Sequence, residues 1–379
     1  MRVMFVTSPV LSHIFPTVPL AHALLAAGHE VRYAVGSELH AVSQAGMHAA
    51  DITPGLDYTP LWMAEGEEDP MYAEDVGVEF LAELFARVSG AEVSGVLDLA
   101  RDFAPDLIVH SAAQGAAALV AAALRLPCVE VPLGPADSDP RLARLLRSGM
   151  RREYERHRVT GEPAATARIN TLPPSLQHLL PGRSPGSFTG PDEWSMAYVP
   201  YNGGGELPDW LSRPSRPRLA VTLGSMGAQW GGITVLKSLF ANAGSVDAEF
   251  VLTLGGGDVS LLGELPGNVR VVEWMPLAPL LKTCAGVIHH AGSGTLLTAM
   301  RLGVPQCVLP HGSYQMTNAA VLTGAGTGFI ADPDTLGEAE CERLLTDTSL
   351  RSAGARIGEE IRSLATPADL VPRMVALAA

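Results

Sequence analysis

The chain alternates short apolar segments with helical segments, and it does so in two separate series. In the first series, the apolar run at 2–7 is followed by an apolar helical segment at 17–27, which Gly28 can end. Strands that alternate with helices in this way predict a parallel sheet covered by helices on both faces. Because 379 residues exceed one comfortable core, the repeated pattern predicts two such domains.

The boundaries of the predicted elements follow from the same pattern. The first series predicts strands at 2–7, 30–35, 107–110 and 128–132, and helices at 17–27, 78–88, 93–103 and 115–124. The second predicts strands at 219–223, 250–254, 269–273, 287–290, 304–309 and 327–331, with terminal helices at 350–364 and 367–377. A stretch rich in Gly and Pro at 201–217 separates the series, as an interdomain linker would. We therefore predict domains at 1–200 and 218–360, followed by a carboxyl-terminal helix within 361–379.

Charge and cysteine usage exclude several classes of protein. The 40 acidic residues outnumber the 26 basic ones, and no run of Lys or Arg is present, so nucleic acid is not an expected partner. The four cysteines are scattered without the spacing of a metal site, which predicts reduced thiols in a cytoplasmic protein. We expect neither a signal peptide at the start nor an apolar run long enough to span a membrane.

A histidine pair and a glycine-rich loop follow the predicted strand at 287–290. The segment HHAGSGT then leads into a helix that Gly303 can end. Glycines let the backbone approach a ligand, and the first N–H groups of a helix, with its positive end, attract an anion. His290 can add a ring N–H, whereas His289 lies one residue earlier and should point to the other side. This pattern predicts a phosphate site.

Two nucleotide-binding motifs, Walker A and GxGxxG, are absent from the sequence, and this limits the type of phosphate ligand. The loop is too short for a Walker A motif and no Lys-Ser/Thr pair follows it, which favours a diphosphate held without a metal. The first strand is followed by TSPVLSH rather than GxGxxG, which removes most support for a nicotinamide oxidoreductase. The glycines at 255–257 indicate a flexible turn, and no histidines show metal-ligand spacing.

Several motifs, in order and spacing, carry a resemblance to a known family. They are SPVLSHIFPTVPLAHALLAAGHEV, PDLIVH, PPSL, VPYNGGG, TLGS, EWMPL, HHAGSGT and QMTNA. The chain resembles the inverting GT-B glycosyltransferases that use nucleotide sugars, and specifically the actinobacterial enzymes that glycosylate polyketide and enediyne natural products. The resemblance implies an α/β fold of two Rossmann-like domains facing across a cleft, with the last helix packing back on the first domain.

The same resemblance implies the substrates and the chemistry. We expect a metal-independent, inverting transferase without a cofactor, which moves a deoxysugar from a dTDP-sugar, or alternatively a UDP-sugar, to a lipophilic aglycone. A homodimer is compatible with this family. His13 matches the general base that takes the proton of the attacking group. The matching donor-site residues are Ser225, Trp274, Met275, His290, Gly292, Ser293, Gly294, Thr295, Tyr314 and Gln315.

Within this resemblance, Trp274 would stack on the base while the Met275 backbone reads its edge, and Ser225 would face the diphosphate. The other interpretation of Trp274 is a core residue at a strand end, and that of His13 is a helix cap. The apolar residues Trp62, Met63, Phe80 and Phe85 are expected to serve packing, although the region 51–85 is where an acceptor pocket would be lined.

Two departures from the family pattern bear on activity. Many relatives orient the catalytic histidine with a carboxylate where this chain has Ser111, which puts the strength of the base in doubt. Asp137, Asp139, Glu65 or Asp75 could substitute for that carboxylate, and an acidic acceptor such as a phenol or enol would need a weaker base. Tyr314 stands where relatives have an Asp that accepts hydrogen bonds from the sugar hydroxyls, which favours a sugar with fewer hydroxyls. The other interpretation is that the Tyr314 side chain turns outward and a backbone group takes over that contact. These departures keep open the alternative of an impaired relative that acts as an activator or binding subunit.

Overall fold

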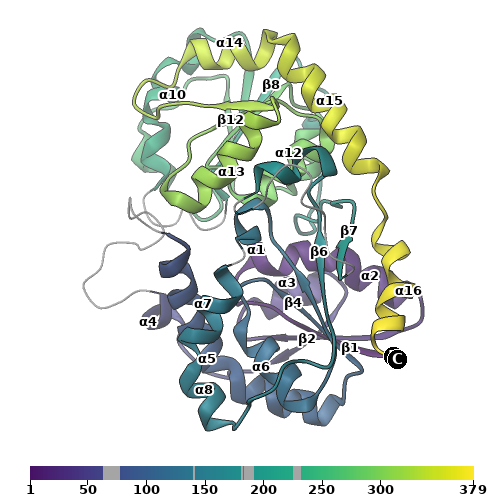
Figure 1. Ribbon diagram of the computed structural model, residues 1–379. Coiled ribbons are helices and arrows are strands. Elements are labelled where there is room, and N and C mark those ends of the chain that lie inside the picture. The colour runs from purple at the N-terminus through teal and green to yellow at the C-terminus, as the bar shows by residue number, and fades with distance from the viewer. Residues whose placement is uncertain (63–76, 140, 181, 183–191, 225–231) are drawn as a thin grey trace. The chain divides into compact units, whose positions relative to one another are not determined.

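The computed structural model describes residues 1–62, 77–139, 141–180, 182, 192–224 and 232–379. These residues divide into two compact units (Figure 1). The first unit comprises Met1–Gly203 together with Leu364–Ala379, and the second comprises Gly204–Ser363. The chain therefore passes to the second unit inside the Gly- and Pro-rich stretch and returns to the first with its last helix. Among the described residues, no helix is long and apolar enough to cross a membrane.

A seven-stranded parallel sheet forms the centre of the first unit, in the order β3-β2-β1-β4-β5-β6-β7. Its strands are β1 (Arg2–Val6), β2 (Glu30–Val35), β3 (His48–Asp51), β4 (Leu107–Ser111), β5 (Cys128–Val131), β6 (Thr166–Asn170) and β7 (Glu193–Ser195). The register pairs Val6 of β1 with His110 of β4. Because both strands run in the same direction, the residues that follow them meet at one edge of the sheet.

Apolar side chains cover both faces of this sheet, as a parallel sheet requires. On one face, α2 (Val18–Ala26) and the terminal α16 (Pro367–Leu377) share a core in which Leu24 and Met374 are fully buried. On the other face lie α5 (Val78–Phe103) and α6 (Gly115–Leu124). The last helix is thus part of the first unit's core, and Figure 1 shows it, in yellow, beside α2.

The prediction of two helices at 78–88 and 93–103 was wrong, because α5 continues from Val78 to Phe103. Gly90 lies between the two predicted segments and Gly95 lies inside the second, and the helix continues through both, although glycine weakens a helix. In the structure, a Cβ at Gly95 would overlap the carbonyl oxygen of Ile52. Gly95 therefore allows the helix to lie close to the chain after β3, and it does not end the helix.

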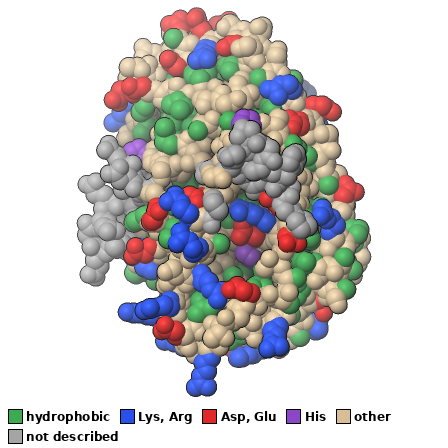
Figure 2. Space-filling model, viewed as in Figure 1, with side chains coloured by type: hydrophobic (Ala, Val, Ile, Leu, Met, Phe, Trp, Pro, Cys, Tyr) green, Lys and Arg blue, Asp and Glu red, His purple; other side chains and the backbone are tan. Residues whose placement is uncertain are grey.

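Arginines gather on the shorter helices α7 (Arg141–Gly149) and α8 (Arg151–Arg156), and basic side chains are prominent on the lower part of the face in Figure 2. Several of these arginines pair with carboxylates. The pairs are Arg141 with Glu79 and Asp139, Arg147 with Glu162, Arg151 with Glu155, and Arg156 with Glu153. Much of the positive charge on these helices is therefore balanced by neighbouring acidic groups.

The second unit has a six-stranded parallel sheet in the order β10-β9-β8-β11-β12-β13. Its strands are β8 (Arg218–Thr222), β9 (Glu249–Thr253), β10 (Val269–Val272), β11 (Gly286–His289), β12 (Gln306–Val308) and β13 (Gly328–Ile330). Its helices include α10 (Lys237–Asn242), α11 (Leu277–Leu281), α12 (Ser293–Leu302), α13 (Gly312–Gly324), α14 (Glu338–Thr346) and α15 (Thr348–Ser363). The predicted two sheets of parallel strands are confirmed, and each strand predicted in this unit is present within one or two residues.

Three strands of the first unit were not predicted. β3 and β7 form the two edges of the sheet, and β6 is next to an edge. Edge strands bury less side-chain surface than central strands and therefore tolerate polar residues. The β3 sequence, HAAD, is half polar, and none of its four residues is fully buried. The hydrophobic period that identified the central strands is therefore weak at the edges.

Candidate active site

The loop after β11 brings the histidine pair to the carboxyl end of the second sheet. His289 is completely buried, and its Nε2 lies 2.9 Å from Oε1 of Gln306. Its Nδ1 accepts the backbone N–H of Ala291 at 3.2 Å, so Nε2 carries the ring proton and donates it to Gln306. Both ring nitrogens of His289 thus hold the loop in place.

The His290 ring lies between two glycines. A Cβ at Gly224 would lie 2.8 Å from its Cε1, and a Cβ at Gly292 would overlap its Nε2. The Nδ1 atom is buried and has no hydrogen-bond partner among the described residues. Burial lowers the pKa of His290 to about 4, so the ring is neutral near pH 7 and carries one N–H. A hydrogen bond to the Thr222 backbone opposes this lowering of the pKa in part. A neutral ring whose Nδ1 lacks a partner among the described residues, beside a glycine loop, is suited to a polar ligand.

The start of α12 supplies backbone donors next to this ring. Gly292 is the N-cap residue, and no side chain caps the helix among the described residues. The first turn contains Ser293, Gly294 and Thr295, whose N–H groups belong to the four that a helix cannot satisfy internally. The helix dipole adds partial positive charge at this point. The arrangement can bind an anion, as the sequence predicts.

Asn318 of α13 fixes the shape of this loop, a role that sequence reasoning missed. Its buried amide donates to the carbonyl of Ala291 at 2.9 Å and to Oγ of Ser293 at 3.0 Å. Ala291 has a φ of 65°, which residues with a Cβ seldom adopt. The two bonds from Asn318 stabilise this conformation on either side of Gly292. The Asn in the QMTNA motif was a signal for this role.

Tyr314 and Gln315 lie in the first turn of α13. The Tyr314 side chain is half-buried, and its hydroxyl lies 3.2 Å from Oγ of Ser293, so it faces the loop rather than turning outward. Gln315 is buried, and its Oε1 accepts the N–H of His311 at 2.7 Å. The Gln315 amide nitrogen is the group that remains to donate to a ligand.

The segment after β10 carries Trp274 and Met275. Trp274 is 44% exposed, so it is not a core residue at a strand end. Met275 is buried in the core beneath α11. An exposed indole next to an anchored residue can serve as a stacking surface. Ser225, the remaining predicted donor-site residue, lies outside the described residues.

His13 occupies α1 (Leu11–Ile14), directly after β1, and is 4% exposed. Its Nδ1 lies 3.3 Å from Oγ of Ser111, the last residue of β4. The Phe85 ring of α5 contacts the imidazole at a centroid distance of 5.0 Å, and Trp62 packs edge-on against Phe85. Burial lowers the pKa of His13 to about 3. The histidine is therefore neutral and has a hydroxyl as its hydrogen-bond partner.

The two described carboxylates that could have been partners of His13, Asp137 and Asp139, bond to other groups. Oδ2 of Asp137 accepts the N–H groups of Leu133 and Gly134, and Asp139 binds Arg141. Glu65 and Asp75 lie outside the described residues. Among the residues that the structure describes, the hydrogen bond recorded for the His13 ring is thus the one with the Ser111 hydroxyl.

A buried carboxyl on α5, Glu92, was also missed by the sequence analysis. Its oxygens accept the Tyr58 hydroxyl at 2.8 Å and the Gln114 amide at 2.7 Å. Tyr58 in turn bonds Thr53 at 2.8 Å. Burial raises the pKa of Glu92 to about 7. This network joins α5 to the segment that leads to Trp62 and to the cap of α6.

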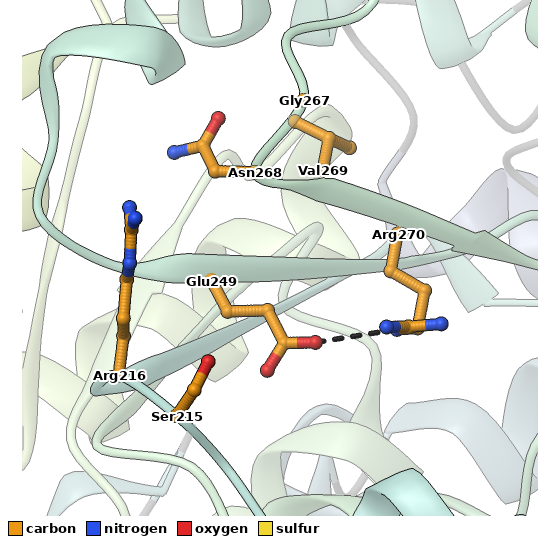
Figure 3. Close-up of a pocket in the computed structure, with 7 residues that line it drawn as sticks. All are labelled: Ser215, Arg216, Glu249, Gly267, Asn268, Val269 and Arg270. Atoms are coloured by element: carbon orange, nitrogen blue, oxygen red, sulfur yellow. Dashed lines mark hydrogen bonds and ion pairs between the residues drawn. The ribbon is translucent and has the colours of Figure 1, made fainter.

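A second polar region, a pocket of about 420 Å³, lies at the amino end of the second sheet (Figure 3). Within it, Arg270 pairs with Glu249, which also binds the buried Arg218. Asn268 donates to three backbone carbonyls. The charged groups Glu249, Arg218 and Arg270 are thus paired with one another, while Oδ1 of Asn268 has no hydrogen-bond partner among the described residues. In the described part of the chain, no group of three or more His, Cys, Asp or Glu side chains is placed to hold a metal ion.

Two family models match the chain. The model described as "Erythromycin biosynthesis protein CIII-like, N-terminal domain" matches residues 22–224, and its C-terminal counterpart matches residues 237–377. The elloramycin glycosyltransferase ElmGT of Streptomyces olivaceus is 35% identical over 389 residues, which cover 99% of this chain and 97% of the relative.

Solved structures of glycosyltransferases share the fold. The glycosyltransferase SnogD from Streptomyces nogalater is 57% identical and superposes with a TM-score of 0.91 over 100% of both chains. The glycosyltransferase SsfS6 of Streptomyces sp. SF2575, complexed with thymidine diphosphate, is 27% identical with a TM-score of 0.81 over 99% of both chains. These similarities extend over the whole chain and confirm the predicted GT-B fold.

Proposed function

This chain belongs to the erythromycin biosynthesis protein CIII-like family of glycosyltransferases, and we propose that it transfers a deoxysugar from a dTDP-sugar to a lipophilic polyketide aglycone with inversion. The observation that carries the donor assignment is the His290 ring beside Gly292 and the start of α12. In the relative SsfS6 the bound nucleotide is thymidine diphosphate, which supports dTDP over the alternative, UDP.

The proposed mechanism assigns separate tasks to the two units. His13 takes the proton of the acceptor while the acceptor attacks the anomeric carbon from the face opposite the diphosphate. As the bond between that carbon and the phosphate oxygen breaks, negative charge grows on the leaving group. The N–H groups at the start of α12 and the His290 ring stabilise this charge, without a metal or a cofactor. Trp274 and the Met275 backbone hold the base, and Ser225 is assigned to the diphosphate.

Tyr314 supports a sugar with few hydroxyl groups. A carboxylate at this position would accept bonds from sugar hydroxyls, whereas the Tyr314 hydroxyl is 3.2 Å from Oγ of Ser293. The proposed donor is therefore a deoxysugar, in which a hydroxyl is missing or replaced.

The test is a transfer assay with purified protein. A panel of dTDP- and UDP-sugars is incubated with aromatic and macrocyclic polyketide aglycones, and products are detected by mass spectrometry. We expect glycoside formation from a dTDP-deoxysugar, with undiminished rate in EDTA. Thermal-shift measurements with dTDP, UDP and NAD run in parallel. Nucleotide binding without transfer to any acceptor would favour the alternative function, an activator or binding subunit. A requirement for Mg²⁺ or Mn²⁺ would contradict the metal-free mechanism.

A further inference from the structure

The environment of His13 restricts which acceptor groups it can deprotonate. The imidazole is 4% exposed, and its Nδ1 is paired with Oγ of Ser111 at 3.3 Å. Its other described ring neighbour is Phe85, an apolar group from α5. Nε2 is thus the ring nitrogen that remains to receive a proton. If it does, the resulting imidazolium has a neutral hydroxyl as its partner.

The Ser111 hydroxyl also accepts a hydrogen bond from the backbone. The N–H of Ser8 donates to the same Oγ at 3.5 Å, within a buried site. When Nδ1 of His13 carries its proton, Oγ therefore accepts two N–H bonds. A hydroxyl can fix the tautomer in this way. It cannot balance a positive charge as a carboxylate does.

Among the described residues, the charged and titratable groups around this pair do not replace a carboxylate. Asp137 is bonded to backbone N–H groups of its own loop, and Glu92 is bonded to Tyr58 and Gln114. His110, next to Ser111, directs its Nδ1 to the Ser111 carbonyl at 3.0 Å. Full transfer of a proton to His13 is accordingly costly, because it would create a buried cation to which the described part of the chain offers no counter-charge.

We propose that the acceptor presents an acidic hydroxyl, a phenol or enol on an aromatic polyketide, rather than an aliphatic alcohol. This inference rests on the proposed function and specifies the attacking group. The acceptor oxygen forms the new bond to the anomeric carbon, and the bond to the diphosphate oxygen breaks with its electron pair. The hydroxyl proton passes to Nε2 of His13 or, for an ionised acceptor, has already left to solvent. An acidic hydroxyl loses its proton readily, so it can react even though the His13–Ser111 pair is a weak base.

A matched series of acceptors tests this proposal. One aromatic scaffold carries either phenolic hydroxyls with pKa values of about 7–10 or a hydroxymethyl group of pKa about 15, at the same position. We expect kcat/KM for the phenols to exceed that for the carbinol by at least about 10³-fold, and to rise as the phenol pKa falls. For the more acidic phenols, the acidic limb of the pH–rate profile should follow the acceptor pKa. Wild-type turnover of the carbinol within about tenfold of the phenols would overturn the proposal.

Variants at position 111 add a second measurement. Ser111→Asp supplies a counter-charge, and it should lower the ratio of kcat/KM for the phenols to kcat/KM for the carbinol by at least about tenfold. Ser111→Ala controls for loss of the hydroxyl alone, and circular dichroism checks the fold of both. A folded Ser111→Asp variant that leaves the ratio of phenol to carbinol unchanged would contradict the role of the pair. Isothermal titration with dTDP separates the two proposals, because absence of nucleotide binding would defeat the proposed function itself.

Discussion

The hydroxyl of Tyr314 lies 3.2 Å from Oγ of Ser293, across the loop that is expected to hold the diphosphate. The same Oγ accepts a bond from Asn318 at 3.0 Å. Both residues of α13 thus support the first residue of α12, so the helix that should contact the sugar also shapes the phosphate loop. A change at Tyr314 is therefore expected to affect both the stability of the loop and the binding of the donor.

The coupling between these residues can be measured by a double-mutant cycle of Tyr314→Phe and Ser293→Ala. Tyr314→Phe should lower the free energy of unfolding by about 0.5–1.5 kcal/mol, the usual contribution of a hydrogen bond. Ser293→Ala should cost more, because it also leaves the Asn318 amide without one acceptor. Urea unfolding of the four proteins gives the interaction energy. Additive effects of the two changes would show that the bond contributes nothing.

Gly294→Ala separates the fold of the loop from its contact with ligand. A Cβ at Gly294 meets no atom within 4 Å, and the residue lies in the first turn of α12. We expect the variant to be as stable as the wild type or up to about 1 kcal/mol more stable, since alanine favours helix. Its dTDP affinity should fall about tenfold or more if the diphosphate approaches this backbone. Gly161→Ala, also open within 4 Å, is the control that should keep full affinity.

His290 should contribute a neutral hydrogen bond to dTDP binding. Because burial lowers its pKa to about 4, the ring stays uncharged from pH 6 to 8. His290→Ala should weaken dTDP binding about two- to tenfold, corresponding to about 0.5–1.5 kcal/mol. Titration calorimetry at several pH values should show that this difference is the same at pH 6 and pH 8. Affinity equal to that of the wild type, or of the exposed control His40→Ala, would place the diphosphate elsewhere.

Glu92 should make the first unit less stable as pH rises. Its pKa is raised to about 7 in the folded chain, so between about pH 4.5 and 7 the folded state holds a proton that the unfolded state has lost. The contribution of Glu92 to the free energy of unfolding therefore falls across this range, by about 3 kcal/mol in total. In Glu92→Gln, the new amide can donate to Tyr58, which can donate to Thr53 at 2.8 Å.

Denaturant unfolding between pH 4.5 and 8 tests whether the contribution of Glu92 to the free energy of unfolding falls as the pH rises. Glu92→Gln should gain stability relative to the wild type as the pH increases, and the exposed control Glu83→Gln should follow the wild type. Because the chain has two units, the transition of the first must be resolved, for example by the fluorescence of Trp194 in β7. A difference between Glu92→Gln and wild type that does not change with pH would contradict the raised pKa.

The sequence by itself determined the central strands, several of the helices, the glycine-rich loop that leads into α12, and the family. These features are local. A buried parallel strand shows as an apolar run, and the HHAGSGT loop lies within one strand-to-helix connection. The edge strand β3 and the continuity of α5 through 89–92 were not predicted, and both depend on what the backbone packs against.

Only the tertiary structure decided how the candidate site residues are paired. His13 and Ser111 are 98 residues apart, and they meet because Val6 and His110 are opposite one another in adjacent parallel strands. Register likewise brings Tyr314 to Ser293, while close packing confines His290 between Gly224 and Gly292. Residue type can indicate a base or a donor. The proton affinity of that group depends on burial and on the partner that the fold supplies, and here the partner of His13 is a hydroxyl.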